Sequence, residues 1–410
     1  MADRRSLAGR SAILTAARPS ARKNGGVEPV SWTPAQVRAR RLDRQLLLAP
    51  ASGELPAVVS AMCGAHAQVM SAAELSIGLR MKGITKTSVQ QALWVDRSLI
   101  KTYGPRGTVH LLPAADLPTW TGALSAVPPG NPTPADFSLN QDQADEVVKA
   151  IDAALTDHDC MTVDELGSAV ITSTGSWAAD QVVPAFGGWW PRWRPALAVA
   201  GQRGVLCFGP DRGRSVTYTS PASWLPDAPP LAHTTALTAL VRCYLGSFGP
   251  ATSAHFAQWL AAPREWAADL FADLADQLTE VDIAGTAGQL STGDGDPPTK
   301  RAGGVRLLPY FDSYVIGGRP REDIYPRPVA DRALSRGQAG TVPVVLVNGV
   351  VGGVWHHRRA GRTVHITVEL LRDLSRRQRS QLSDEVDRTA GILEAKPSVT
   401  FGPVPVGRHL

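Results

Sequence analysis

One pattern limits the fold of this sequence more than any other feature. Several short helices are followed by a two-stranded hairpin, and this pattern recurs along the chain. In its first occurrence, apolar residues at helical spacing predict three helices, and residues of alternating polarity then predict two strands. These elements span Leu55–Met62, Ala72–Arg80, Thr87–Asp96, Leu99–Tyr103 and Thr108–Leu112. An earlier helix is predicted to begin at Pro34, with Thr33 as its cap. The turn between the strands contains Arg106, so the hairpin has a tight, basic tip.

The same order returns twice more, at a spacing of roughly 100 residues. The second occurrence has a hairpin whose turn carries Arg212 and Arg214. Its predicted helices are Asp142–Ala154, Val163–Ile171, with Thr162 as its cap, and Trp193–Ala200. The third has predicted helices at Thr234–Phe248, Ser253–Leu260 and Pro263–Leu274, and strands at Gln277–Ile283 and Gln289–Ser291. Helices followed by a hairpin with a basic tip are typical of a winged-helix unit, so the sequence predicts three such units in tandem.

The chain changes character after the loop at Gly293–Gly304. Four segments rich in β-branched residues then predict strands, two of which are joined by the hairpin turn Asn348-Gly349. A last helix is predicted over Ser375–Leu393. We therefore expect an α+β protein with three tandem winged-helix domains and a small C-terminal β-barrel-like domain. The expected divisions are a disordered basic arm at 1–30, winged-helix domains at 31–125, 135–225 and 231–300, and the β-rich domain with its closing helix at 301–410.

Composition narrows the class of protein. With 410 residues, 43% of them hydrophobic and 19% charged, the chain has the balance of a folded soluble protein. It lacks the ~18 consecutive apolar residues of a membrane-spanning helix, so we expect a cytoplasmic protein without a membrane partner. Its 4 cysteines form no C-x-x-C pair, which indicates neither a zinc site nor a disulfide framework. We expect no metal and no cofactor.

Charge is distributed unevenly along the chain. Residues 1–110 hold 16 Lys and Arg against 6 Asp and Glu, residues 111–300 hold 9 against 21, and residues 301–410 hold 17 against 10. Of the 42 basic residues 35 are Arg, whose planar guanidinium matches the geometry of phosphate. This distribution favours a polyanionic partner held by the two basic ends, the alternative being ordinary solvated charge.

Six short segments occur in an order and spacing that are specific as a set. They are Gly64–Gln68 with Gly78–Arg80, Arg106–Leu111, Ser247–Thr252, Leu307–Tyr314 and Val350–Trp355. Together they resemble the bacterial AlkZ/YcaQ-like DNA glycosylases, also described as winged-helix DNA-binding domain-containing proteins, and the resemblance runs from about Ser31 to the C-terminus. It implies three tandem winged-helix domains curved around duplex DNA, and removal of alkylated purines. In some members these include crosslinked guanines made by a self-produced genotoxin.

The resemblance also indicates catalytic residues. The family's signature is Gln-x-Gln, or Gln-x-Asp in the YcaQ-like branch, and the matching tripeptide here is His66-Ala67-Gln68, with its first position changed. Residues i and i+2 of an extended segment point to the same side, so both side chains are expected to face one water at the sugar C1′. A cationic alkylpurine is already a good leaving group. Neutral His66 and Gln68 therefore suffice to orient or activate that water.

The residues expected to contact DNA are Arg80, Arg106, His110, Arg212, Arg214, Arg319 and Arg321. Several assignments have structural alternatives. In these alternatives, His66 and Gln68 cap the helix that begins near Ser71, and the wing-tip arginines lie in solvated turns. The alternative for His110 is that it packs against a residue of the neighbouring strand. Asp312 is expected to fix a turn, and the aromatic cluster Trp189–Trp193 to lie in the core rather than to stack on a base.

The leading hypothesis is a monofunctional DNA glycosylase for alkylated purines of the N7-alkylguanine type in duplex DNA, bulky genotoxin adducts and crosslinks included. It would act in base-excision repair or in self-resistance to a DNA-alkylating natural product, as a nucleoid-associated monomer, since three linked domains can embrace DNA without dimerising. The alternative is a non-catalytic tandem winged-helix DNA-binding or regulatory protein. A third hypothesis is a damage-binding protein in which His66 has disabled catalysis.

Overall fold

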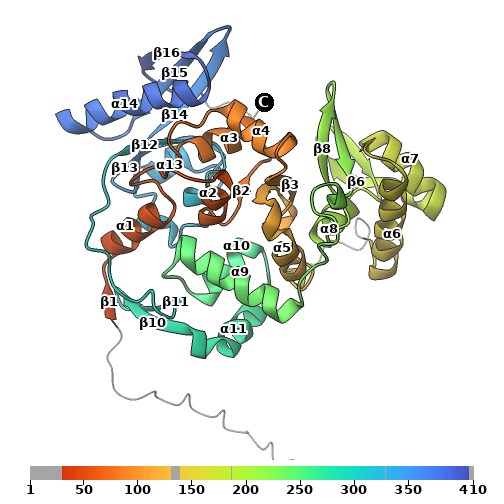
Figure 1. The fold of residues 1–410 in the computed structure, drawn as a ribbon. Helices are drawn as coiled ribbons and strands as arrows, with labels where there is room; N and C mark the ends of the chain where they lie inside the picture. Colours follow the sequence, from red (N-terminus) through yellow and green to blue (C-terminus); the bar gives the residue numbers. More distant parts are fainter. Residues whose placement is uncertain (1–29, 131–138, 186, 328, 406–410) are drawn as a thin grey trace, which may run out of the picture.

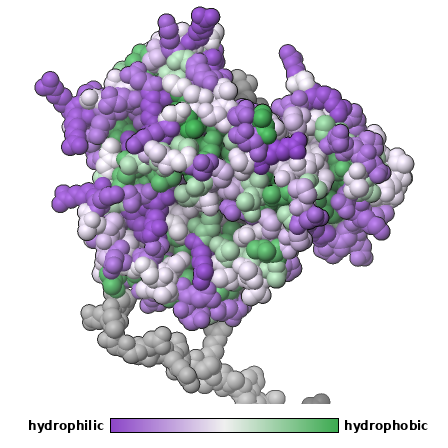
Figure 2. Space-filling view, viewed as in Figure 1, coloured by the Kyte–Doolittle hydropathy of each residue, from purple (hydrophilic) through white to green (hydrophobic). Residues whose placement is uncertain are grey.

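The computed structural model describes residues 30–130, 139–185, 187–327 and 329–405, and the predicted basic arm lies outside these ranges apart from Val30. The first, third and C-terminal parts form a broad body, with the second part set to one side (Figure 1). The face seen in this view is mostly hydrophilic, and its hydrophobic residues gather in small patches (Figure 2).

The first unit contains the predicted helices and hairpin. Its short strand β2 joins the hairpin in a sheet of order β2–β4–β3. The bounds are α2 Leu55–Ala61, β2 Ala65–His66, α3 Met70–Gly78, α4 Lys86–Trp94, β3 Leu99–Tyr103, β4 Val109–Pro113 and α5 Leu117–Leu124. Pairing of β2 with β4 places His66 opposite His110.

The second unit repeats this order, with a sheet of order β5–β9–β8. Its bounds are α6 Gln141–Asp157, β5 Met161–Thr162, α7 Val163–Thr174, β6 Gln181–Ala185, β7 Gly188–Pro191, α8 Ala196–Gln202, β8 Cys207–Arg212 and β9 Ser215–Thr219. Helix α7 begins at the predicted cap, where Thr162 and Glu165 form a reciprocal capping box.

The hairpin β6–β7 was not predicted. It is inserted between α7 and α8 and forms a separate two-stranded sheet. Trp189 and Trp190 lie on it and are 56% and 41% exposed, whereas Trp193 is buried. The expectation that the aromatic cluster lies in the core is therefore wrong for the first two and confirmed for the third.

The third unit shares its sheet with the start of the described chain. Its own elements are α9 His233–Phe248, α10 Ser253–Leu260, α11 Arg264–Asp273, β10 Leu278–Ile283 and β11 Thr286–Ser291. Strand β1 (Val30–Trp32) runs parallel to β10 in a sheet of order β1–β10–β11. Helix α1 (Pro34–Arg44), capped by Thr33 as predicted, directs the buried Arg41 guanidinium to the carbonyls of Phe248 and Pro250 at 2.7 and 3.0 Å. Residues 30–44 thus pack with the third unit, although the sequence analysis assigned most of them to the first.

The C-terminal part contains an open sheet, so the prediction of a barrel-like domain is wrong. The strand order is β12–β13–β14–β15–β16, and in the described residues the two edge strands do not pair with each other. The bounds are β12 Val305–Leu308, α12 Ser313–Gly317, α13 Val329–Ala333, β13 Val344–Val347, β14 Val350–Ala360, β15 Thr363–Leu370, α14 Arg376–Ile392 and β16 Lys396–Phe401. Helix α14 connects the parallel strands β15 and β16 and packs on the sheet. It covers an apolar face of the sheet, so this face is buried without closure.

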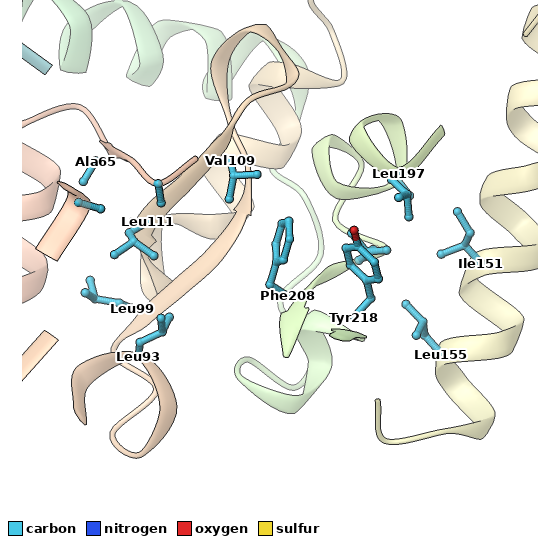
Figure 3. Packing of buried hydrophobic residues seen from close by; sticks show 14 of the residues in the cluster. Ala65, Leu93, Leu99, Val109, Leu111, Ile151, Leu155, Leu197, Phe208 and Tyr218 are labelled. Atoms are coloured by element: carbon cyan, nitrogen blue, oxygen red, sulfur yellow. The ribbon is translucent and has the colours of Figure 1, made fainter. Parts of the chain in front are cut away.

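One apolar core joins the first and second units. Phe208 and Tyr218 of the second unit lie between Val109 of β4 and Leu197 of α8 (Figure 3). The ring centroids of Tyr103 and Phe208 are 5.3 Å apart across the same boundary. The hairpin β3–β4 is therefore packed against the second unit and does not project freely as a wing.

A fully buried ion pair joins the first unit to the C-terminal part. Arg80, just after α3, donates its two terminal nitrogens to the two carboxylate oxygens of Asp312, each at 2.8 Å, and both side chains are 0% exposed. Asp312 also accepts from the Tyr314 backbone N–H at 3.0 Å, which caps α12. The turn-fixing role expected of Asp312 is thus confirmed. Because Arg80 has no contact with solvent, the expectation that it binds DNA is wrong.

Replacing Asp312 by Ala should lower the free energy of unfolding by about 3–5 kcal/mol, because the Arg80 charge is then buried without its partner. Urea denaturation followed by circular dichroism measures this loss. The exposed pair Arg203–Asp145, with an N–O distance of 2.6 Å, provides the matched control. Asp145→Ala should leave the midpoint almost unchanged because water screens both charges. Equal shifts for the two variants would contradict the structural role of Asp312.

Candidate active site

His66 lies where strand β2 ends. The Ala67 N–H still donates to the Val109 carbonyl at 2.7 Å, and the chain then bends at Gln68 before α3 begins. The N-cap residue of α3 is Val69, and no side chain caps this helix. The alternative that His66 and Gln68 cap the helix is therefore wrong.

The His66 ring is held between two other rings. It stacks on Phe311 at a centroid separation of 4.6 Å and meets His110 edge to face at 5.1 Å. Its side chain is 9% exposed. Burial, and then the nearby Arg106 guanidinium, lower the pKa of His66 to about 4. The imidazole is therefore neutral at physiological pH.

Hydrogen bonds favour one tautomer for each of the two histidines. The Gln68 backbone N–H makes a long contact of 3.4 Å with Nδ1 of His66, which leaves the ring proton on Nε2. At His110, Nδ1 lies 2.9 Å from the Thr108 carbonyl, which can only accept, so Nδ1 carries the proton. Burial and His66 lower the pKa of His110 well below its usual value. His110 is buried against His66, which supports its role as a packing partner rather than a DNA contact.

His66 opens onto a cavity of about 760 Å³ that is rich in arginine. Its lining brings together four arginines from three parts of the chain: Arg106, Arg264, Arg319 and Arg321. The ion pairs among the described residues include none for Arg106, Arg319 or Arg321. Burial, and then Arg319, lower the pKa of Arg106 and of Arg321 to about 10. This concentration of positive charge suits an anionic ligand such as phosphate.

Backbone carbonyls anchor the guanidiniums of Arg106, Arg319 and Arg321. Arg319 donates to the carbonyls of Ile316 and Gly318, both at 3.0 Å. Arg106 donates to Trp259 and Arg321 to Val315. Since a guanidinium has five N–H donors, each retains donors for a ligand. Arg106 was expected at an exposed wing tip, but its turn packs between α8 and α10, so the residue faces the cavity instead.

Gln68 faces a different cavity from His66. Its exposed side chain lines a cavity of about 600 Å³ between the first and second units. The turn before β4 forms the wall, with Arg106 and Thr108 lining the His66 cavity and Gly107 and Val109 lining the other. In this structure the two side chains of the tripeptide do not share a cavity. The i, i+2 argument does not apply because the strand ends at His66.

The second wing tip carries the two predicted arginines. Both are exposed, but Arg212 is paired with the Glu165 carboxylate at 2.8 Å and donates to the Cys160 carbonyl at 3.1 Å. Arg214 lines the same cavity as Gln68. Arg214 therefore shares this cavity with Gln68, whereas the charge of Arg212 is partly neutralised by the Glu165 carboxylate.

Besides Arg264, the residues of the His66 cavity that sequence reasoning missed include His255, Gln258 and Phe311. Phe311 had a signal, because it precedes Asp312 in a segment that carries the family resemblance. Its φ of 56° is unusual for a bulky residue and turns the chain beside the buried ion pair. The other two belong to α10 and had no local signal, since only packing brings this helix to the cavity.

Two negative findings concern the described part of the chain. Within it, no group of three or more His, Cys, Asp or Glu side chains is placed to share a metal ion. The helices in the same ranges are all too short or too polar to cross a lipid bilayer.

Comparison with known proteins agrees with the resemblance seen in the sequence. The family model described as DNA glycosylase AlkZ-like matches residues 59–392. An interstrand DNA cross-link repair glycosylase from Streptomyces sahachiroi is 32% identical over 356 residues, which cover 79% of this chain and 87% of that protein. The structure of Streptomyces sahachiroi DNA glycosylase AlkZ matches with a TM-score of 0.73 and 29% identity, over 90% of this chain and 100% of the other. The matched range contains residues 66–68, the arginines of the cavity and Asp312. The chain belongs to the AlkZ-like family and is a DNA glycosylase.

Proposed function

We propose that this glycosylase is monofunctional and hydrolyses the N-glycosidic bond of alkylated purines of the N7-alkylguanine type in duplex DNA, as a monomer. The observation that carries the proposal is a neutral, buried His66 at the wall of an arginine-rich cavity. The relative from Streptomyces sahachiroi is a cross-link repair glycosylase, which supports bulky genotoxin adducts and crosslinks as substrates. The setting would be base-excision repair or self-resistance to a DNA-alkylating natural product.

Hydrolysis of this bond needs neither an acid to protonate the leaving base nor a strong base to deprotonate the water. Alkylation at N7 makes the purine cationic, so the electron pair of the C1′–N9 bond leaves with N9 and neutralises the base. The sugar is left with oxocarbenium character, water oxygen adds to C1′, and that water loses one proton to the solvent. A neutral imidazole is compatible with a positive sugar, whereas an imidazolium would repel it.

Two observations support orientation of this water by His66 in preference to general-base catalysis. A pKa of about 4 makes the ring a weak proton acceptor. The Gln68 contact leaves the proton on Nε2, so the ring can hold the water oxygen by donating to it. Gln68 faces the cavity between the first and second units. In the proposal it assists His66 by contacting the DNA from that cavity.

The order of elements supports DNA binding by three tandem winged-helix domains. The first two units both run helix, short strand, two helices and hairpin. In the third, the bridge Ala251–Gln289 takes the position of the short strand between α9 and α10. We infer that the anchored arginines Arg106, Arg319 and Arg321, together with Arg214, contact phosphates of the duplex. The alternative of a non-catalytic regulatory protein is wrong, because the chain belongs to a glycosylase family.

Gln68→Ala should reduce release of N7-methylguanine from a duplex at least about tenfold, with the melting temperature unchanged because the side chain is exposed.

His66→Ala should lower the rate by less than about 10²-fold if the ring only orients water. His66→Gln, which restores the family's commoner tripeptide, should keep activity. Single-turnover assays with chromatography of the free base measure these rates. Release that survives both Ala substitutions would place the active site elsewhere, and no release by the wild type would favour a damage-binding protein.

The pH profile should report the lowered pKa of His66. The ring is neutral above a pKa of about 4 and becomes imidazolium as the pH falls through it. The enzyme-dependent rate should therefore stay level from about pH 8 to about pH 5 and fall only near pH 4, well below the ordinary histidine value of about 6.5. Assays with the spontaneous rate subtracted test this, and His66→Gln should lack the acid decline. A decline near pH 6.5 that depends on His66 would contradict the burial argument.

Arg321→Gln should weaken duplex binding similarly across sequences and reduce the slope of log affinity against log salt by about 0.9, the value for one phosphate. Fluorescence anisotropy in a salt series measures both. The control is Arg212→Gln, whose smaller effect follows from the carboxylate that already pairs with Arg212. If Arg321→Gln leaves both the salt slope of binding and the melting temperature unchanged, this arginine does not contact the DNA.

A further inference from the structure

The hairpin β6–β7 is a feature that the proposed reaction does not use. It places two large indoles at the surface: Trp189 is 56% exposed and Trp190 is 41% exposed, although tryptophan is on average highly buried. Neighbouring residues of a strand point to opposite faces, so the two indoles lie on opposite sides of the hairpin. A ligand on one side therefore contacts one indole.

Of the two, Trp190 lines the cavity that also contains Gln68. The same cavity has three further aromatic residues in its lining: Tyr103, Phe208 and Tyr218. The Arg194 guanidinium lies over the Trp190 ring, 4.8 Å from its centroid, and Arg214 lines the cavity as well. We call this aromatic and cationic cavity the Trp190 groove.

The Trp190 groove adjoins the active site. One segment lines both cavities, because Arg106 and Thr108 line the His66 cavity and Gly107 and Val109 line the groove. Gln68 lies in the lining of the groove, two residues after His66. A nucleotide in the groove would therefore lie across this segment from the cavity that contains His66.

We propose that the Trp190 groove binds one unpaired nucleobase of the DNA, which stacks on Trp190 while Arg194 and Arg214 contact the flanking phosphates. The proposal rests on the proposed function in taking damaged duplex DNA as the ligand. Aromatic rings beside arginines are the surface on which any base stacks, because every base has a π face. The lining holds two arginines against one carboxylate, that of Asp164, which favours an anionic ligand. A protein partner covering the hairpin would be expected to engage Trp189 as well, whereas a stacked base needs only Trp190.

The test uses the full chain and a duplex with a single bulged 2-aminopurine, compared with the same duplex fully paired. Stacking quenches the fluorescence of 2-aminopurine. The wild type should bind the bulged duplex roughly tenfold more tightly than the paired one, within the range of base–aromatic stacking, and should quench its fluorescence. Equal affinity for the two duplexes, without quenching, would overturn the proposal.

The hairpin itself provides the matched control. Trp190→Ala should abolish the preference and the quenching, and Trp190→Phe should keep part of both because a ring remains. Trp189→Ala removes a more exposed indole from the same strand and should leave both intact. Melting temperatures near that of the wild type are expected for all three. Equal losses in Trp189→Ala and Trp190→Ala, or no loss in either, would rule out stacking in the groove.

Release of N7-methylguanine from a paired duplex, measured in parallel, separates this proposal from the proposed function. If the wild type releases the base but Trp190→Ala binds the bulged duplex normally, the groove proposal alone fails. If the wild type shows bulge binding that depends on Trp190 but releases no base, the proposed reaction alone fails.

Discussion

The buried ion pair between Arg80 and Asp312 determines the geometry of the active site. Arg80 follows α3, and the segment that leads from β2 into that helix contains His66 and Gln68. Asp312 directly follows Phe311, which stacks on His66. The bidentate contact therefore fixes two segments far apart in the sequence and brings the Phe311 ring against the imidazole. Since either charge without the other is costly to bury, neither segment can shift independently.

The same packing sets the charge state of the site. Phe311 and His110 cover His66, and burial together with Arg106 keeps its ring neutral. The guanidiniums of the cavity stay charged and are anchored by backbone carbonyls. The cavity therefore combines charged guanidiniums, which we propose bind phosphates, with an uncharged ring beside the site proposed for a cationic sugar. A histidine at this position is compatible with this arrangement because burial keeps its ring neutral.

The tripeptide lies across a wall and does not face a single cavity. His66 is on the side with the arginines, and Gln68 is on the side with the aromatic residues of the Trp190 groove. The turn that forms the wall is held in place by the second unit, whose Phe208 packs against Tyr103. The second unit therefore contributes to the site although none of its residues lines the His66 cavity in the described chain.

The sequence by itself determined the elements whose signals are local. Caps at Thr33 and Thr162 were predicted because each side chain bonds to a backbone group three residues away. His66 and Gln68 were located through motifs that also lie within a few residues. Tertiary structure decided the rest: that Arg80 is buried against Asp312, that α14 covers an open sheet, and that β2 ends at His66, so the two catalytic candidates face different cavities. These outcomes depend on partners distant in the chain, and burial of a charge or the direction of a side chain at a strand end is set by those partners rather than by neighbouring residues.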